Sequence, residues 1–129
     1  MRAMFRSLIA LAMLAASAPA LAAPPAPNLA VKGKLIFLRC GACHAVSATA
    51  PKKVGPHLQG VVGRASGSVV GFTYSPAMKK ADLTWTEANL DKWLTRPAGL
   101  VPGTAMVFAG LPNADDRKAV IAYLKKPAP

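Results

Sequence analysis

Apolar residues recur at helical spacing in three stretches of the chain. The first stretch ends at a pair of cysteines, and its apolar positions are Gly33, Ile36, Phe37 and Cys40. The second is expected to start with a capping box, Thr84-x-x-Glu87, and to end at Pro97, with apolar positions Leu90, Trp93 and Leu94. The third is expected to be capped by Asn113 and to end before Pro127, with apolar positions Ala119, Val120, Tyr123 and Leu124. The pattern predicts an all-α domain in which the first helix crosses the last one at Gly33.

The stretches between these helices have the composition of loops. Between residues 45 and 71, glycines recur every eight residues among scattered prolines and serines, which predicts irregular backbone. Met78 lies in what is expected to be a short helical turn before Lys79-Lys80.

The first 28 residues are expected to lie outside the folded domain. Arg2 and Arg6 precede an apolar run over residues 8–16, and Ala20-Leu21-Ala22 has the small-x-small spacing of a signal-peptidase site. We therefore interpret 1–22 as a signal peptide, 23–28 as a Pro/Ala-rich tether and 29–129 as one domain. This organisation predicts a periplasmic protein with no stable membrane insertion after cleavage, whereas an uncleaved anchor is the alternative.

The chain is strongly basic, with 16 Lys+Arg against 5 Asp+Glu. Without Arg2 and Arg6 the net charge falls only from +11 to +9, so the basicity belongs to the domain. Such a charge favours anionic partners. Nucleic acid is not expected among them, because no cluster of four or more Lys/Arg occurs and only 6% of the residues are aromatic.

The segment Cys40-Gly41-Ala42-Cys43-His44 carries the candidate chemistry. Cys-x-x-Cys-His is the pattern for covalent haem attachment, in which both sulfurs bind one porphyrin and the histidine reaches its iron. The alternative, a disulfide or a thioredoxin-like thiol pair, favours a βαβ context, whereas this motif ends a predicted helix. We therefore predict one haem c, bound through Cys40 and Cys43 and ligated by His44.

The second axial ligand decides between an electron carrier and an open-site protein. After removal of the signal peptide the candidates are Met106, Met78 and His57. Met106 is preferred, because it follows Pro102-Gly103-Thr104 in an irregular loop that could lie across the far face of the ring. A saturated iron passes electrons, so an electron carrier is predicted and not an enzyme. A peroxidase or small-gas sensor with a displaceable Met ligand is the alternative.

From Asn28 to Lys126 the chain resembles the class I c-type cytochromes, in the mitochondrial and photosynthetic-bacterial branch. The resemblance rests on landmarks that stand in order: Cys40-x-x-Cys43-His44, Lys53-Val54-Gly55-Pro56, Gly63-Arg64, Gly71-Phe72-Thr73-Tyr74, Thr84-Trp85, Pro102-Gly103-Thr104-Ala105-Met106, Phe108-Ala109-Gly110 and Ile121-Ala122-Tyr123-Leu124. It implies the cytochrome c fold, with three to five helices and long loops wrapped around one haem.

The resemblance also implies roles for single residues. The carbonyl of Pro56 would accept the ring N–H of His44, and Thr104 would lie beside the methionine. Phe108 would cover the methionine-side edge of the haem. The residues implied to hold the haem propionates are Arg64, Tyr74 and Trp85.

Partners implied by the resemblance are redox proteins with acidic docking surfaces, such as an oxidase, a reductase or a dehydrogenase, and the protein is expected to be a monomer. Arg39 and Lys53 remain near the expected haem edge. Where relatives commonly carry lysines around the methionine loop, this chain has Ala98, Gly99, Ala105 and Asn113. Trp93 and Met78 stand where a tyrosine and an asparagine are common.

Overall fold

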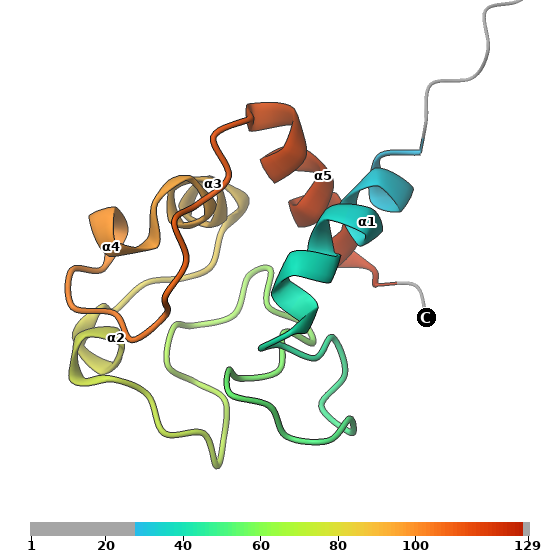
Figure 1. Ribbon diagram of the computed structural model, residues 1–129. Helices are drawn as coiled ribbons and strands as arrows, with labels where there is room; N and C mark the ends of the chain where they lie inside the picture. Colours follow the sequence, from blue (N-terminus) through green and yellow to red (C-terminus); the bar gives the residue numbers. More distant parts are fainter. Residues whose placement is uncertain (1–27, 128–129) are drawn as a thin grey trace, which may run out of the picture.

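The computed structural model describes residues 28–127, which form five α-helices and no strand (Figure 1). The helices are α1 (Leu29–Gly41), α2 (Pro76–Lys80), α3 (Glu87–Thr95), α4 (Pro97–Leu100) and α5 (Ala114–Lys125). The prediction of an all-α domain with three to five helices is confirmed. The predicted signal peptide (1–22) and all but the last residue of the tether (23–28) lie outside the described residues, as do 128–129.

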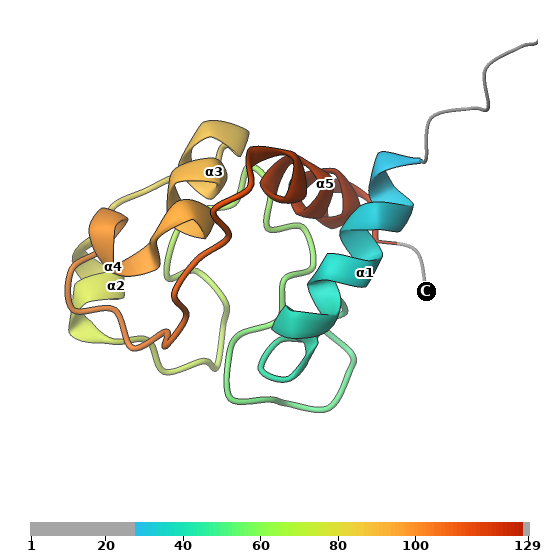
Figure 2. The ribbon, with the colours of Figure 1, turned by 45° about the horizontal axis from the view of Figure 1, so that its top comes forward.

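The first and last helices cross and pack tightly, as Figures 1 and 2 show. At the crossing, a Cβ on Gly33 would lie 2.0 Å from the carbonyl oxygen of Ala119, so only glycine allows this approach. Phe37 and Tyr123 stack beside it with their ring centroids 5.3 Å apart. The contact predicted from Gly33 is confirmed, and it fixes the helix that carries the cysteine motif.

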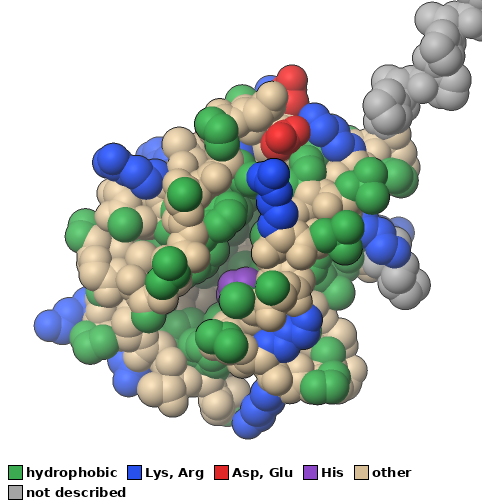
Figure 3. Space-filling view, in the orientation of Figure 1, with side chains coloured by type: hydrophobic (Ala, Val, Ile, Leu, Met, Phe, Trp, Pro, Cys, Tyr) green, Lys and Arg blue, Asp and Glu red, His purple; other side chains and the backbone are tan. Residues whose placement is uncertain are grey.

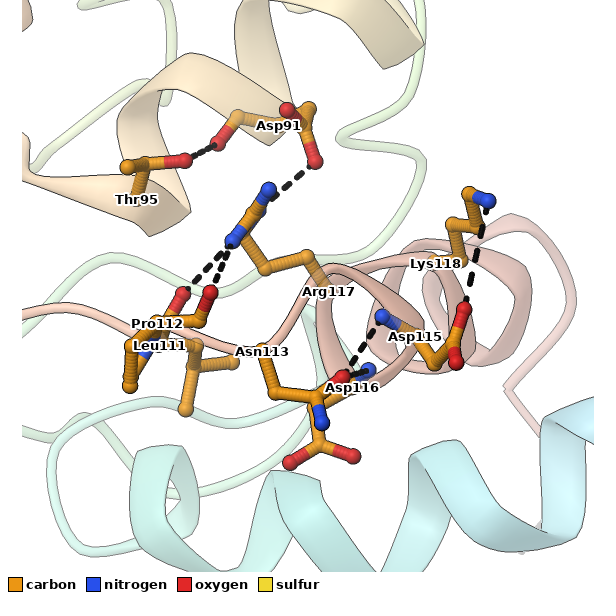
Figure 4. Close-up of polar contacts among 9 residues, drawn as sticks. All are labelled: Asp91, Thr95, Leu111, Pro112, Asn113, Asp115, Asp116, Arg117 and Lys118. Atoms are coloured by element: carbon orange, nitrogen blue, oxygen red, sulfur yellow. Dashed lines mark hydrogen bonds and ion pairs between the residues drawn. The ribbon is translucent and has the colours of Figure 1, made fainter.

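Both crossing helices begin at an asparagine cap. The side chain of Asn28 accepts a hydrogen bond from the backbone N–H of Ala30 at 3.0 Å. The side chain of Asn113 accepts from Asp115 N at 2.8 Å and from Asp116 N at 3.2 Å (Figure 4). These oxygens satisfy N–H groups that the helix itself leaves unpaired, which confirms the start predicted for the last helix.

The predicted start of the third helix is wrong by two residues. Thr86, and not Thr84, is the N-cap, and its hydroxyl accepts from the backbone N–H of Asn89 at 3.1 Å. The reason is that Thr84 and Trp85 are bonded elsewhere: Thr84 pairs with Ala65 in an isolated bridge, and Trp85 N donates to the Arg64 carbonyl at 2.8 Å. A helix can begin only after this pairing ends.

A strap of irregular backbone, residues 101–113, leads from α4 to α5. Leu111 N donates to the Leu94 carbonyl at 2.7 Å, which ties the strap to α3. Arg117 of α5 holds its end, because its guanidinium donates to Asp91 at 2.7 Å and to the carbonyls of Leu111 and Pro112 at 2.9 Å each (Figure 4). At the other end, Val101 N donates to the Pro97 carbonyl of α4 at 2.9 Å, so both ends of the strap are bonded to helices.

The segment from 42 to 75 contains no helix and wraps around one side of the molecule, which confirms the irregular backbone predicted for 45–71 (Figures 1 and 2). Within the part of the chain that the structure describes, no helix has the length and apolar character needed to span a membrane.

Candidate haem-binding site

A cavity of about 430 Å³ opens to the surface between the end of α1, the 42–75 segment and the strap. Figure 3 shows it as a hollow with a histidine side chain inside. The structure brings all ten predicted site residues to its wall: Cys40, Cys43, His44, Pro56, Arg64, Tyr74, Trp85, Thr104, Met106 and Phe108. Residues from across the sequence thus converge on one cavity.

Cys40 lies in the last turn of α1 and Cys43 in the turn that follows, with their thiols unbonded to each other. Cys40 is half-buried, and Cys43 is exposed. Burial raises the pKa of the Cys40 thiol, whereas the charge of Arg39 acts to lower it. The N–H groups of Cys43 and His44 both donate to the Cys40 carbonyl, at 3.0 and 2.8 Å, so that the chain turns sharply. This turn places the histidine on the same cavity wall as the thiols.

The imidazole of His44 is oriented by its backbone neighbours. Its Nδ1 lies 2.7 Å from the Pro56 carbonyl oxygen, and because a carbonyl can only accept, Nδ1 carries the proton. Nε2 then keeps a lone pair available to a metal. Burial lowers the pKa of His44, which favours this neutral ring. A Cβ on Gly55 would lie 2.4 Å from His44 Cε1, so glycine there makes room for the ring.

Of the three sulfur and imidazole candidates for the second ligand, two line the cavity. Met106 lies half-buried on the strap, and its backbone N–H donates to the Thr104 hydroxyl at 3.3 Å. Met78 lies on α2 and is only 8% exposed. His57 instead lines a second cavity behind the 42–75 segment. Its Nδ1 is buried with no hydrogen-bond partner among the described residues.

Comparisons with known proteins show the family of this chain. The sequence profile of the family described as Cytochrome c matches residues 30–127. The chain belongs to the cytochrome c family. It is 54% identical over 94 residues to cytochrome c2 of Rhodomicrobium vannielii, covering 73% of this chain and 75% of that protein. Cytochrome c-550 of Nitrobacter winogradskyi is 45% identical over 94 residues, covering 73% and 86%.

The fold comparison leads to the same family. The structure of cytochrome cH from Methylobacterium extorquens superposes with a TM-score of 0.70 at 43% identity, covering 74% of this chain and 96% of that one. As a member of the cytochrome c family, the protein carries a covalent haem c at Cys40 and Cys43. It is an electron carrier and not an enzyme.

The cavity fits a haem, which is an apolar ring with two carboxylates at one edge. Most of the wall is apolar, and it includes core residues that sequence reasoning did not assign to the site: Val61, Leu90, Leu94, Val120 and Leu124. Trp85 and Trp93 pack against each other in this cytochrome with centroids 5.3 Å apart.

Polar donors gather on one part of the wall. The guanidinium of Arg64 donates to the carbonyls of Gln59 at 2.6 Å and His57 at 3.0 Å. The Tyr74 hydroxyl accepts from the backbone N–H of Val69 at 3.2 Å, which leaves its own proton for another acceptor. A buried carboxylate needs donors and a positive charge of this kind.

Proposed function

We propose that this cytochrome shuttles single electrons between redox proteins, with the haem iron held between His44 Nε2 and the sulfur of Met106. The observation that carries the proposal is the His44–Pro56 hydrogen bond, which fixes the neutral tautomer in a cavity whose wall also contains Met106. When bound, the haem supplies an iron that cycles between ferrous and ferric states, and a thioether ligand favours the ferrous one.

The residues around the iron ligands act by holding them in place. Pro56 orients the His44 ring and raises its basicity through the hydrogen bond. Thr104 fixes the backbone of Met106, and Phe108 shields the methionine side from water. Because both ends of the strap are bonded to helices, the strap would hold Met106 in the same place in both oxidation states and so keep the reorganisation energy low.

The propionates are assigned to Arg64, Tyr74 and Trp85. Arg64 brings the charge, while the Tyr74 hydroxyl and the Trp85 ring N–H bring further donors. Three donors on one part of an otherwise apolar wall support this assignment. No other charged side chain on the cavity wall is buried or half-buried.

The protein is proposed to act in the periplasm as a monomer. Residues 1–22 would direct its export, and residues 23–28 would form a tether before the domain that begins at residue 29. The apolar run and Ala20-Leu21-Ala22 support export. Its partners are proposed to dock through acidic surfaces, which the net charge of +9 without residues 1–22 supports.

The ligand assignment is tested by Met106→Ala and a matched Met78→Leu variant. In the ferric holoprotein, Met106→Ala should abolish the long-wavelength sulfur-to-iron absorption band, while Met78→Leu should retain it. Cyanide and carbon monoxide should bind slowly to the wild type and fast to Met106→Ala. A band that survives in Met106→Ala and is lost in Met78→Leu would contradict the assignment, and fast cyanide binding by the wild type would contradict a saturated iron.

A further inference from the structure

The outer face of α1 carries an apolar strip whose side chains are mostly exposed. Val31, Leu35 and Leu38 are 60%, 65% and 71% exposed. At i, i+4 and i+7 they lie on one line along the helix, about 10 Å long. The buried residues of α1, Gly33 and Phe37, lie on the opposite side. We call Val31, Leu35 and Leu38 the α1 strip.

Cations border the α1 strip on both sides. From the helical rotation of 100° per residue, Lys34 lies on one side, and Lys32 and Arg39 lie on the other. The helix contains no carboxylate. Lys32 reaches Asp116 of α5 at 2.8 Å, which is away from the strip. An apolar line between positive borders is complementary to an apolar ridge flanked by carboxylates.

The mouth of the haem cavity continues this apolar surface. Val54 and Val107 line the cavity and are 83% and 101% exposed, and Ala105 is exposed beside Val107. Arg39 is the one charged residue that both lines the cavity and is exposed. In Figure 3 the hollow and the hydrophobic side chains over α1 lie on the same face of the molecule. Arg39 joins the two regions, because it borders the strip and lines the mouth.

We infer that the docking surface for a redox partner extends from the cavity mouth along the α1 strip. The partner's face then has an apolar ridge that covers Leu38, Leu35 and Val31, with carboxylates opposite Lys34 and Arg39. This inference rests on the proposed function, since it names the second half of the surface through which the electron carrier meets its partner. The α1 strip would add apolar contact area to the docking surface at the cavity mouth, where few side chains are charged.

Two other occupants fit the surface less well. A bilayer resting on the α1 strip would also face the cavity mouth, so the haem edge would be turned away from any protein partner. A second copy of this chain would bring Lys34 and Arg39 against the same cations, and each molecule already has a large positive charge. A redox partner with carboxylates on its docking face would leave the haem edge facing the partner and would bring opposite charges together.

The test compares the wild-type holoprotein with a Val31→Thr, Leu35→Gln double variant. Neither residue lines the cavity, so the visible spectrum and the midpoint potential should stay the same. Val70→Thr is the matched control, because Val70 is 98% exposed and lines only the second cavity. Oxidation of the ferrous proteins is measured with a purified bacterial cytochrome c oxidase that accepts electrons from the wild type, and with hexacyanoferrate(III).

The double variant should raise KM for the oxidase about fivefold with kcat unchanged, while Val70→Thr leaves both unchanged. The rate with hexacyanoferrate(III) should be equal in all three proteins, since a small anion needs no strip. An unchanged KM in the double variant would overturn the inference. The proposed function fails separately, if the wild type passes no electrons even to hexacyanoferrate(III).

If the strip instead binds a lipid bilayer or a second copy of the chain, the double variant should show an unchanged KM for the oxidase. If the strip binds lipid, the wild type should bind phosphatidylglycerol vesicles and the double variant should not. If it joins two copies, sedimentation equilibrium should show a wild-type dimer that the double variant loses. Either result would replace the redox partner as the occupant.

Discussion

Substituting Gly33 by alanine should destabilise the protein, because it forces apart the two helices that hold the haem-attachment motif. The new Cβ would lie 2.0 Å from the Ala119 carbonyl oxygen, 2.6 Å from its carbon and 2.8 Å from Tyr123 Cβ. Ordinary contacts at such a Cβ begin near 3.4 Å, so α1 and α5 must separate by about 1.4 Å at the crossing.

The magnitude follows from what that separation removes. A gap of about 1 Å already forfeits up to half of the dispersion energy between facing atoms. Removing a buried aromatic ring outright costs about 3–5 kcal/mol, and two rings, Phe37 and Tyr123, face each other here. Half of that is about 1.5–2.5 kcal/mol for each ring, or about 3–5 kcal/mol for the two. Alanine returns about 1 kcal/mol of helix propensity, so the net loss should be about 2–4 kcal/mol.

The assay is guanidinium denaturation of the ferric holoproteins, followed by far-ultraviolet circular dichroism and haem absorbance. Gly41→Ala is the matched control, because a Cβ on this last residue of α1 meets nothing within 4 Å. Its free energy of unfolding should equal the wild-type value or exceed it by up to about 1 kcal/mol. A Gly33→Ala protein within about 0.5 kcal/mol of the wild type would refute the reasoning, since the helices would then separate at no cost.

Three further predictions concern the haem site. Gly55→Ala should displace the His44 ring, because the new Cβ would lie 2.4 Å from His44 Cε1, and it should therefore lower the yield of protein with covalently bound haem. Chromatography of the exported protein with in-gel haem staining would measure this yield. A normal yield with an unchanged spectrum would contradict the prediction. In the holoprotein, acid should release His44 from the iron only well below its ordinary pKa of about 6.5, since burial lowers the pKa of this ring and the iron competes with the proton for Nε2. An acid titration followed by the visible spectrum of the ferric protein should show this ligand loss; a loss centred near pH 6.5 would refute the explanation. A Cys40→Ala, Cys43→Ala chain should lose cooperative thermal unfolding in calorimetry, because it lacks the largest apolar component of its core; a sharp two-state melt would count against that.

Much of the site could be predicted because the haem motif and its supporting residues are local signals. Cys40, Cys43 and His44 are adjacent in the sequence, and the glycine at 33 together with helical spacing points to a close crossing. Asn113 identified the start of α5 for the same reason, since capping depends only on the next three residues.

The features that sequence reasoning missed depend on long-range pairing. Thr84 has the spacing of a cap, but the backbone pairing of Thr84 and Trp85 with residues 63–65 delays the helix to Glu87. α4 was not predicted, because in the sequence Pro97 indicates only the end of the helix before it. In the structure, Pro97 also stands in the first turn of a new helix, a position that proline favours. The sequence contains only a weak indication of the role of Gly55 beside His44, namely that this glycine precedes Pro56, whose carbonyl orients the His44 ring.

The ion pairs of α5 have one more consequence. Four of the five side-chain carboxylates form ion pairs with cations: Asp116 pairs with Lys32 of α1, Glu87 and Asp91 pair with Lys125 and Arg117 of α5, and Asp115 pairs with Lys118 within α5. In Figure 3 the acidic side chains visible on the face with the hollow are confined to the edge near the start of α5. Each pair is neutral, whereas most of the cations outside these pairs lie on other segments of the described chain, among them Lys52, Lys53, Lys79, Lys80 and Arg96. The molecule therefore has an electric dipole moment whose positive end points away from α5. In the field of a negatively charged protein this moment exerts a torque that turns α5 away and presents the opposite side first, so that fewer encounters begin in an unproductive orientation.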